Sequence, residues 1–185
     1  MALVKKIVTE SVKIVILASI LSTIGGIGVE SLKAKIALFV PMIIMLPALN
    51  DMIGDFGTII SSKFTTLLYL GKIDGKWWNS KELGELFKDI AYIAIFSAVY
   101  LGVASTAIAY FKGFAFDWII ALKVLTVALM ATAFLVMIIF GVAIIGGLIV
   151  FKRGADPDNF LAPLTTAIAD LGSMLLFSLM IRFLF

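Results

Sequence analysis

Long apolar segments separated by short polar turns dominate the chain. A membrane helix needs about 20 mostly apolar residues, and the segments reach that length. They predict five helices, over residues 10–29, 36–62, 86–111, 117–151 and 162–185. The fourth would measure roughly 50 Å at about 1.5 Å per residue, so we expect it to tilt or protrude from the bilayer. The pattern therefore predicts an all-α integral membrane protein with five transmembrane helices per subunit.

The composition agrees with a multi-pass protein of the cell membrane. The chain has 185 residues, of which 62% are hydrophobic and 15% are charged. Average soluble domains are roughly half apolar and a quarter charged. We expect residues 1–185 to form a single transmembrane domain in contact with the lipid bilayer. Few residues precede the first helix, so we expect no cytoplasmic regulatory domain. The basic residues lie in turns between apolar segments and do not indicate nucleic-acid binding.

The distribution of basic residues predicts the orientation. Cytoplasmic turns of membrane proteins are enriched in lysine and arginine. With the N-terminus inside, the cytoplasmic group is Lys5, Lys6, Lys63, Lys72, Lys76, Lys81, Lys88, Lys152 and Arg153. The opposite group is smaller and consists of Lys33, Lys35, Lys112 and Arg182. We therefore expect five spans with the N-terminus in and the C-terminus out.

The available side chains restrict the chemistry. The chain contains no cysteine and no histidine. This excludes disulfides and thiolate metal sites, and it removes the usual general base of nucleophilic enzymes. Carboxylates, hydroxyls, amides and backbone carbonyls remain, and these oxygen ligands suit hard cations. The composition therefore suits hard cations such as Mg²⁺, Ca²⁺ and Mn²⁺.

The second apolar segment carries a polar stripe. Small and polar residues recur at helical spacing, at Pro47, Asp51, Gly54/Asp55, Thr58, Ser61/Ser62 and Thr65. Such a stripe must face water or protein, because polar groups in lipid are costly. We expect Asp51 and Asp55 to lie toward the cytoplasmic end of their helix. Simple solvation of either acid is the alternative to a functional role there.

The last apolar segment repeats this arrangement around Asp170. Pro163, Thr166, Asp170 and Ser173 share one face of the predicted helix, and Pro163 would fall in its first turn. Our hypothesis is that the carboxylate of Asp170 holds a hydrated divalent cation in a pore. The alternative is a protonated acid bonded to a neighbouring helix. The third and fourth helices carry no such stripe, and we expect them to be lipid-facing cladding.

Two motifs resemble the MgtE and solute carrier family 41 magnesium transporters. The first comprises Pro47-Ala48-Leu49, Gly54-Asp55, Ser61-Ser62-Lys63-Phe64-Thr65-Thr66 and Gly71. The second comprises Asp156-Pro157-Asp158-Asn159, Pro163, Thr165-Thr166 and Asp170. Their order and separation match those of the family, and the similarity extends over nearly the whole chain from about Ile36.

The resemblance implies an MgtE-like pore domain in which two five-helix units pair as a homodimer. The second and fifth helices would line the pore, and Asp170 of both subunits would hold the hydrated ion. The implied lining residues are Pro47, Ala48, Gly54, Thr58, Pro163, Thr166, Ala169 and Ser173. The family has Gly-Asn where this chain has Gly54-Asp55, a difference that adds a negative charge near the pore.

These observations favour a divalent-cation channel or transporter, most readily for Mg²⁺, that is not an enzyme and needs no cofactor. Asp51, Asp55 and Asp170 are the candidate metal-binding residues. An exchanger coupled to Na⁺ or H⁺ is an alternative within the same class. From another class, a metal-dependent phospholipid enzyme could use Asp51 and Asp55, although the longer aspartate pattern of such enzymes is absent. An accessory membrane subunit would show no flux alone.

Overall fold

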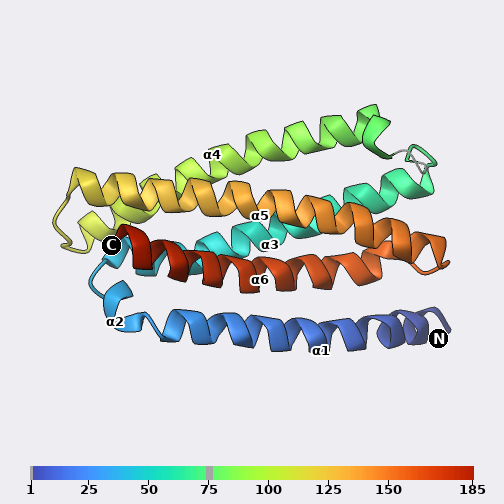
Figure 1. Cartoon of the computed structure of the whole chain (residues 1–185), viewed down its shortest axis with the longest axis horizontal. Helices are drawn as coiled ribbons and strands as arrows, with labels where there is room; N and C mark the ends of the chain where they lie inside the picture. Colours follow the sequence, from blue (N-terminus) through green and yellow to red (C-terminus); the bar gives the residue numbers. More distant parts are fainter. Residues whose placement is uncertain (1, 74–76) are drawn as a thin grey trace.

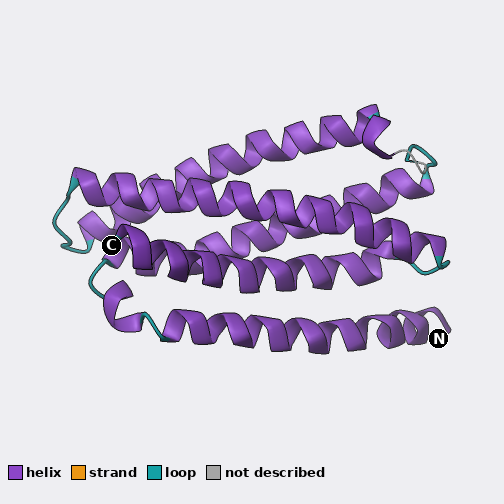
Figure 2. Cartoon of the chain, in the orientation of Figure 1, coloured by secondary structure: helices purple, strands orange, loops and turns teal. Residues whose placement is uncertain are grey.

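Five long helices and a few short turns make up the structure, a computed structural model (Figures 1 and 2). It describes residues 2–73 and 77–185, with the backbone alone for residues 2–7, 9–11 and 13. The long helices are α1 (Ala2–Glu30), α3 (Val40–Tyr69), α4 (Lys81–Phe111), α5 (Trp118–Lys152) and α6 (Pro157–Leu184). The short elements are α2 (Lys33–Ile36) and the 3-10 turn η1 (Trp77–Asn79). The prediction of an all-helical chain is confirmed.

The long helices lie side by side, and the two ends of the chain are at opposite ends of the bundle (Figure 1). Helix α6 packs against α1, α3 and α5, and α4 packs against α3 and α5. Helices α3 to α6 are long and apolar enough to cross a membrane, and the described apolar part of α1, Ile14–Glu30, is shorter. Which end faces the cytoplasm stays a prediction. One residue used for it, Lys76, lies outside the described residues.

The second predicted helix is displaced along the chain. It was expected over residues 36–62, but α3 begins at Val40 and ends at Tyr69. Pro41 explains the start, because a proline in the first turn lacks only a hydrogen bond that the helix does not need. The polar residues after 62 include no helix breaker, so the helix continues to Tyr69, and Gly71, with a φ of 66°, reverses the chain just beyond it.

The other helix starts also differ from the prediction. Helix α4 begins at Lys81 instead of residue 86, and its N-cap is Ser80, whose hydroxyl accepts a hydrogen bond from Leu83 N at 3.2 Å. Helix α6 begins five residues earlier than predicted, because Asp156 caps it and Pro157 occupies its first position. Pro163 therefore lies inside α6 and not in its first turn. The first helix is also longer than predicted.

Helix α5 contributes one of its faces to the core of the bundle. This 35-residue helix is unbroken, as predicted, and buries residues along its whole length. Leu135 and Ile139 are fully buried at its centre. The expectation that the third and fourth helices are cladding describes one face of α5, where Met130, Phe134 and Met137 are exposed, but its other face is buried in the bundle. It fits α4 better, since large apolar side chains such as Tyr92, Phe96 and Tyr100 are exposed there.

Candidate functional site

Asp170 lies at the middle of α6. It is the fourteenth of the 28 residues of that helix and is partly buried. An aspartate at this depth is costly unless something stabilises it. Among the residues that the structure describes, the two ion pairs are Lys33–Glu30 and Lys81–Glu85, so no described basic side chain pairs with Asp170. Any stabilisation by the described residues must therefore come from neutral groups.

Two neighbouring helices donate hydrogen bonds to this carboxylate. Ser22 on α1 donates to Asp170 Oδ2 at 2.7 Å. Asn50 on α3 donates from Nδ2 to Asp170 Oδ1 at 2.7 Å. Ser173, one turn further along α6, donates to Asn50 Oδ1 and thereby orients the amide. We call these four residues the Asp170 network. Because the amide nitrogen faces the carboxylate, the network is complementary to a charged aspartate.

Helices α3 and α6 make further polar contacts nearer the N-terminal end of α6. The Ser61 and Thr165 hydroxyls are 3.2 Å apart, and both side chains are buried. Ser62 donates to Asp158 Oδ1 at 3.2 Å. The hydroxyl groups of the two predicted polar stripes therefore meet at the interface between α3 and α6.

Glycines let the helices approach closely enough for these bonds. A Cβ at Gly25 would lie 3.1 Å from the Leu171 Cα, so α1 rests directly on the backbone of α6 beside Asp170. A Cβ at Gly57 would lie 3.0 Å from the Thr165 Cβ, where α3 meets α6. Short serine and asparagine side chains can span the gap to Asp170 only at such distances.

Asp51 and Asp55 lie elsewhere than the sequence indicated. Asp55 is the sixteenth of the 30 residues of α3, at the helix centre, and Asp51 adjoins Asn50 at the level of Asp170. Neither acid lies toward the end of α3. The error follows from the helix start, because α3 begins later and continues further than predicted. Both side chains are exposed, and they do not join the Asp170 network.

The predicted stripe on α3 divides into two faces. Its outer face is exposed and carries Pro47, Asp51, Asp55, Thr58 and Ser62. Its inner face is buried and carries Gly54, Ser61 and Thr65, of which Gly54 and Ser61 meet α6. Consecutive residues of an α-helix lie about 100° apart around its axis. Adjacent members of the stripe can therefore lie on different faces of α3.

Two open hollows adjoin the Asp170 network. The α1–α6 hollow measures about 590 Å³, and its lining includes Ser19, Ser22, Thr166 and Asp170. The α3 hollow measures about 620 Å³ and is lined by Leu46, Pro47, Ala48, Asn50, Asp51 and Met174. Of the predicted lining residues, Pro47 and Ala48 therefore border one hollow, and Pro163 and Thr166 border the other. Ala169 and Ser173 are buried, and Thr58 is exposed on α3.

Ser22 and Asn50 are the residues that the sequence analysis missed. Asn50 is one position away from the stripe defined by Pro47 and Asp51, and that offset turns it toward α6. An amide in the interior of an apolar segment is itself costly, and this signal could have identified Asn50. Ser22 had no such signal, since serines in membrane helices usually bond to their own backbone.

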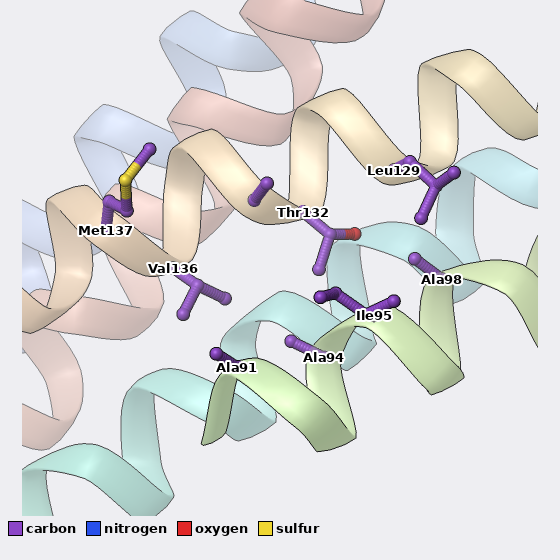
Figure 3. A pocket seen from close by; sticks show the side chains of 9 residues that line it. Ala91, Ala94, Ile95, Ala98, Leu129, Thr132, Val136 and Met137 are labelled. Atoms are coloured by element: carbon purple, nitrogen blue, oxygen red, sulfur yellow. The ribbon is translucent and has the colours of Figure 1, made fainter. Parts of the chain in front are cut away.

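A different kind of hollow lies between α4 and α5 (Figure 3). It measures about 120 Å³ and is bordered by alanines of α4, among them Ala94 and Ala98. The hydroxyl of Thr132 on α5 is buried there and has no hydrogen-bond partner within the described structure. This hollow offers apolar surface and a single hydroxyl, which is no basis for holding a cation.

The family comparison decides what kind of protein this is. The family described as MgtE, divalent cation transporter, matches residues 46–180, which is 135 of the 185 residues. The chain belongs to the MgtE family of divalent cation transporters. No curated protein and no solved structure matches it. The matched region contains Asp170, Asn50 and the whole α3 stripe, whereas Ser22 on α1 precedes it.

Family membership confirms several predictions from the sequence. The chain is a multi-pass membrane protein with an MgtE transmembrane domain, and divalent cations are the substrates of its family. Within the described residues, no three acidic, histidine or cysteine side chains come together as a metal site. A single chain thus presents one carboxylate at the network, and the acids on α3 stand apart from it.

Proposed function

We propose that two copies of this chain form a path for a hydrated divalent cation, with Asp170 of both copies holding the ion. The observation that carries this proposal is the Asp170 network. Its carboxyl group lies at mid-helix and, within the described structure, receives hydrogen bonds only from neutral groups. A divalent cation with its water shell would supply the missing positive charge, and two facing carboxylates suffice for such weak, transient binding.

The exposed face of α3 supports a homodimer. Asp51, Asp55, Thr58 and Ser62 all lie on this outer face, in a helix that is otherwise apolar. Acids facing acyl chains would be strongly unfavourable. A second copy packed with its own polar face opposite would enclose these residues around water. Helices α3 and α6 of both copies would then line the path, as the MgtE resemblance implies.

Mg²⁺ is the ion that this arrangement suits best. It gives up its water shell reluctantly, and therefore needs few direct protein ligands. Asp51, at the level of Asp170, and Asp55, one turn away, would attract the ion and relay it along α3. Mn²⁺ and Ca²⁺ are the alternatives, since both prefer oxygen ligands.

Flux through purified protein in liposomes tests the proposal. Asp170→Ala removes the only carboxylate of the network, and we expect Mg²⁺ flux to fall at least about tenfold while the dimer stays folded. Asp89→Ala is the matched control, because Asp89 is an exposed aspartate on α4 outside the network. Unchanged flux in Asp170→Ala, or an equal loss in both variants, would refute the role of Asp170.

Flux measurements on the same proteoliposomes distinguish a channel from a coupled exchanger. Flux that follows only the Mg²⁺ gradient and the membrane potential indicates a channel. Flux that requires an opposing Na⁺ or H⁺ gradient indicates a coupled exchanger. Membership in a transporter family favours both over the phospholipid enzyme. Metal-dependent turnover of phospholipid by the purified protein would reverse that preference.

A further inference from the structure

The Asp170 network lies between the α1–α6 hollow and the α3 hollow. Asp170 and Ser22 border the first hollow, and Asn50 borders the second. The hydrogen bond from Asn50 to Asp170 therefore joins the walls of two separate hollows. This contact of 2.7 Å therefore lies between the two hollows.

The directions of the helices place these hollows on opposite sides of that hydrogen bond. Helices α1 and α6 run the same way along the bundle, and α3 runs against them (Figure 1). The α1–α6 hollow is lined by residues that precede Asp170 on α6, such as Thr166, and so extends toward the start of that helix. The α3 hollow is lined by residues before Asn50 on α3 and by Met174 after Asp170, and extends toward the other end.

The hydrogen bond between Asn50 and Asp170 competes with a hydrated cation for the same carboxylate oxygens. Both carboxylate oxygens of Asp170 already accept a hydrogen bond from the protein. Water molecules around a divalent cation are donors and need the same oxygens. An asparagine side chain can turn so that its carbonyl oxygen faces the ion's water shell and its nitrogen leaves the carboxylate. The observed arrangement of Asn50 occupies the carboxylate, and the turned arrangement would leave it open to the ion.

We propose that Asn50 is a positioning residue that closes the ion path by bridging α3 to Asp170, and that Ser22 and Ser173 hold the closed arrangement. Ser22 occupies the other carboxylate oxygen, and Ser173 orients the amide of Asn50. The inference rests on the proposed function, because it takes Asp170 as the ion-holding residue.

Thiol labelling tests this barrier independently of transport. The chain has no cysteine, so single cysteines are unambiguous probes. Thr166→Cys places a thiol in the α1–α6 hollow, and Ala48→Cys places one in the α3 hollow. The probe is a membrane-impermeant, positively charged methanethiosulfonate, applied to each side of uniformly oriented proteoliposomes. We expect each cysteine to react from one side only, and the two cysteines to react from opposite sides.

Removing the amide should abolish this separation. With Asn50→Ala in addition, we expect each cysteine to react from both sides, and the rate from the formerly closed side to rise at least about tenfold. Equal reactivity from both sides with Asn50 present would overturn the proposal. So would one-sided reactivity that persists in Asn50→Ala.

Three further variants guard against a trivial result. If Asn50→Ala does not elute as a folded protein in gel filtration, Ser173→Ala replaces it, because it frees the amide without touching the carboxylate of Asp170. The expected change is the same in direction and smaller, and no change overturns the proposal. Thr23→Val is the matched control for Ser22→Ala, since the one hydrogen bond of the Thr23 hydroxyl in the described structure goes to Ser19 O of its own helix, at 2.8 Å. Ser22→Ala should increase labelling from the closed side, and Thr23→Val should not.

The labelling and the flux measurements can fail separately. If Asn50→Ala opens both hollows but Asp170→Ala leaves Mg²⁺ flux unchanged, the barrier is correct and the proposed ion site is wrong. If Asp170→Ala abolishes flux but labelling stays one-sided in Asn50→Ala, the ion site stands and the barrier proposal is refuted.

Discussion

The bundle has a polar half, formed by α1, α3 and α6, and an apolar half, formed by α4 and α5. Both halves use glycine to bring helices together. A Cβ at Gly25 would lie 3.1 Å from the Cα of Leu171, and a Cβ at Gly102 would lie 3.2 Å from the Cα of Leu125. The packing geometry of the two contacts is nearly the same. Close packing by small residues is therefore a general feature of this fold, and it does not identify the site.

The two halves differ in what happens to polar groups at mid-helix. In the polar half, Asp170 and Asn50 bond to each other across helices, and Thr165 lies against Ser61. Unpartnered buried hydroxyls occur in both halves of the described structure, at Thr65 on α3, Ser178 on α6 and Thr132 on α5, but in the apolar half no network of bonds between helices stands beside the one at Thr132, which faces a small apolar hollow. Polar groups in lipid-embedded helices are expensive, so a connected set of them indicates function more strongly than an isolated one does. Three predictions test this difference, beginning with the largest expected effect.

Valine at Gly25 and at Gly102 should separate packing from function. Each side chain would collide with a neighbouring backbone, and we expect each variant to lose about 1–3 kcal/mol of stability. Only Gly25→Val should also change Mg²⁺ flux, because it moves Ser22 away from Asp170 and removes one bond of the closed network. We expect the flux per folded protein to rise severalfold. Thermal unfolding and liposome flux are the measurements.

The control for this pair is Gly26→Val. A Cβ at Gly26 meets no atom within 4 Å, so its stability should stay within about 0.5 kcal/mol of the parent. An equal loss in Gly25→Val and Gly26→Val would mean that the close contact has no energetic importance. An equal change of flux in Gly25→Val and Gly102→Val would remove the distinction between the two halves.

Replacing the charge on the outer face of α3 should alter ion preference. Asp55→Asn restores the residue that the MgtE resemblance leads one to expect, and it removes one negative charge beside the proposed path. Attraction to a divalent ion is twice that to a monovalent ion, so the preference for Mg²⁺ over Na⁺ should fall by about fivefold, or about 1 kcal/mol. The dimer should form as before. Flux of both ions, compared in one preparation, measures the ratio, and an unchanged ratio would place Asp55 away from the path.

The smallest effect compares two buried threonines. Thr165→Val breaks the contact with Ser61 and should cost about 1 kcal/mol. Thr132→Val replaces an unpartnered hydroxyl with a methyl group of similar shape, and it should be neutral or slightly stabilising. Differential scanning fluorimetry in detergent measures both. Destabilisation of Thr132→Val as large as that of Thr165→Val would show that the apolar half also depends on its polar group.

Much of the fold could be predicted from local features of the chain. Apolar segments of membrane length gave the five long helices, and the helical spacing of Asp51 and Asp55 gave the exposed stripe on α3. The helix ends were less predictable, because Ser80 and Asp156 start α4 and α6 through caps that lie in polar turns of several candidate residues. The depth of Asp55 was misjudged for the same reason, since depth is counted from a helix end.

The sequence by itself determined that a lone acid, Asp170, sits inside an apolar segment, and that small and hydroxylated residues share its face. It did not determine what meets that acid. Ser22 and Asn50 are 148 and 120 residues away along the chain, and only the rotation and close approach of three helices bring them to the carboxylate. Periodicity reports which residues share a face of one helix, whereas a hydrogen bond between helices depends on distances of tenths of an ångström. The tertiary structure decided those distances, through the glycines at which α1 and α3 rest on α6.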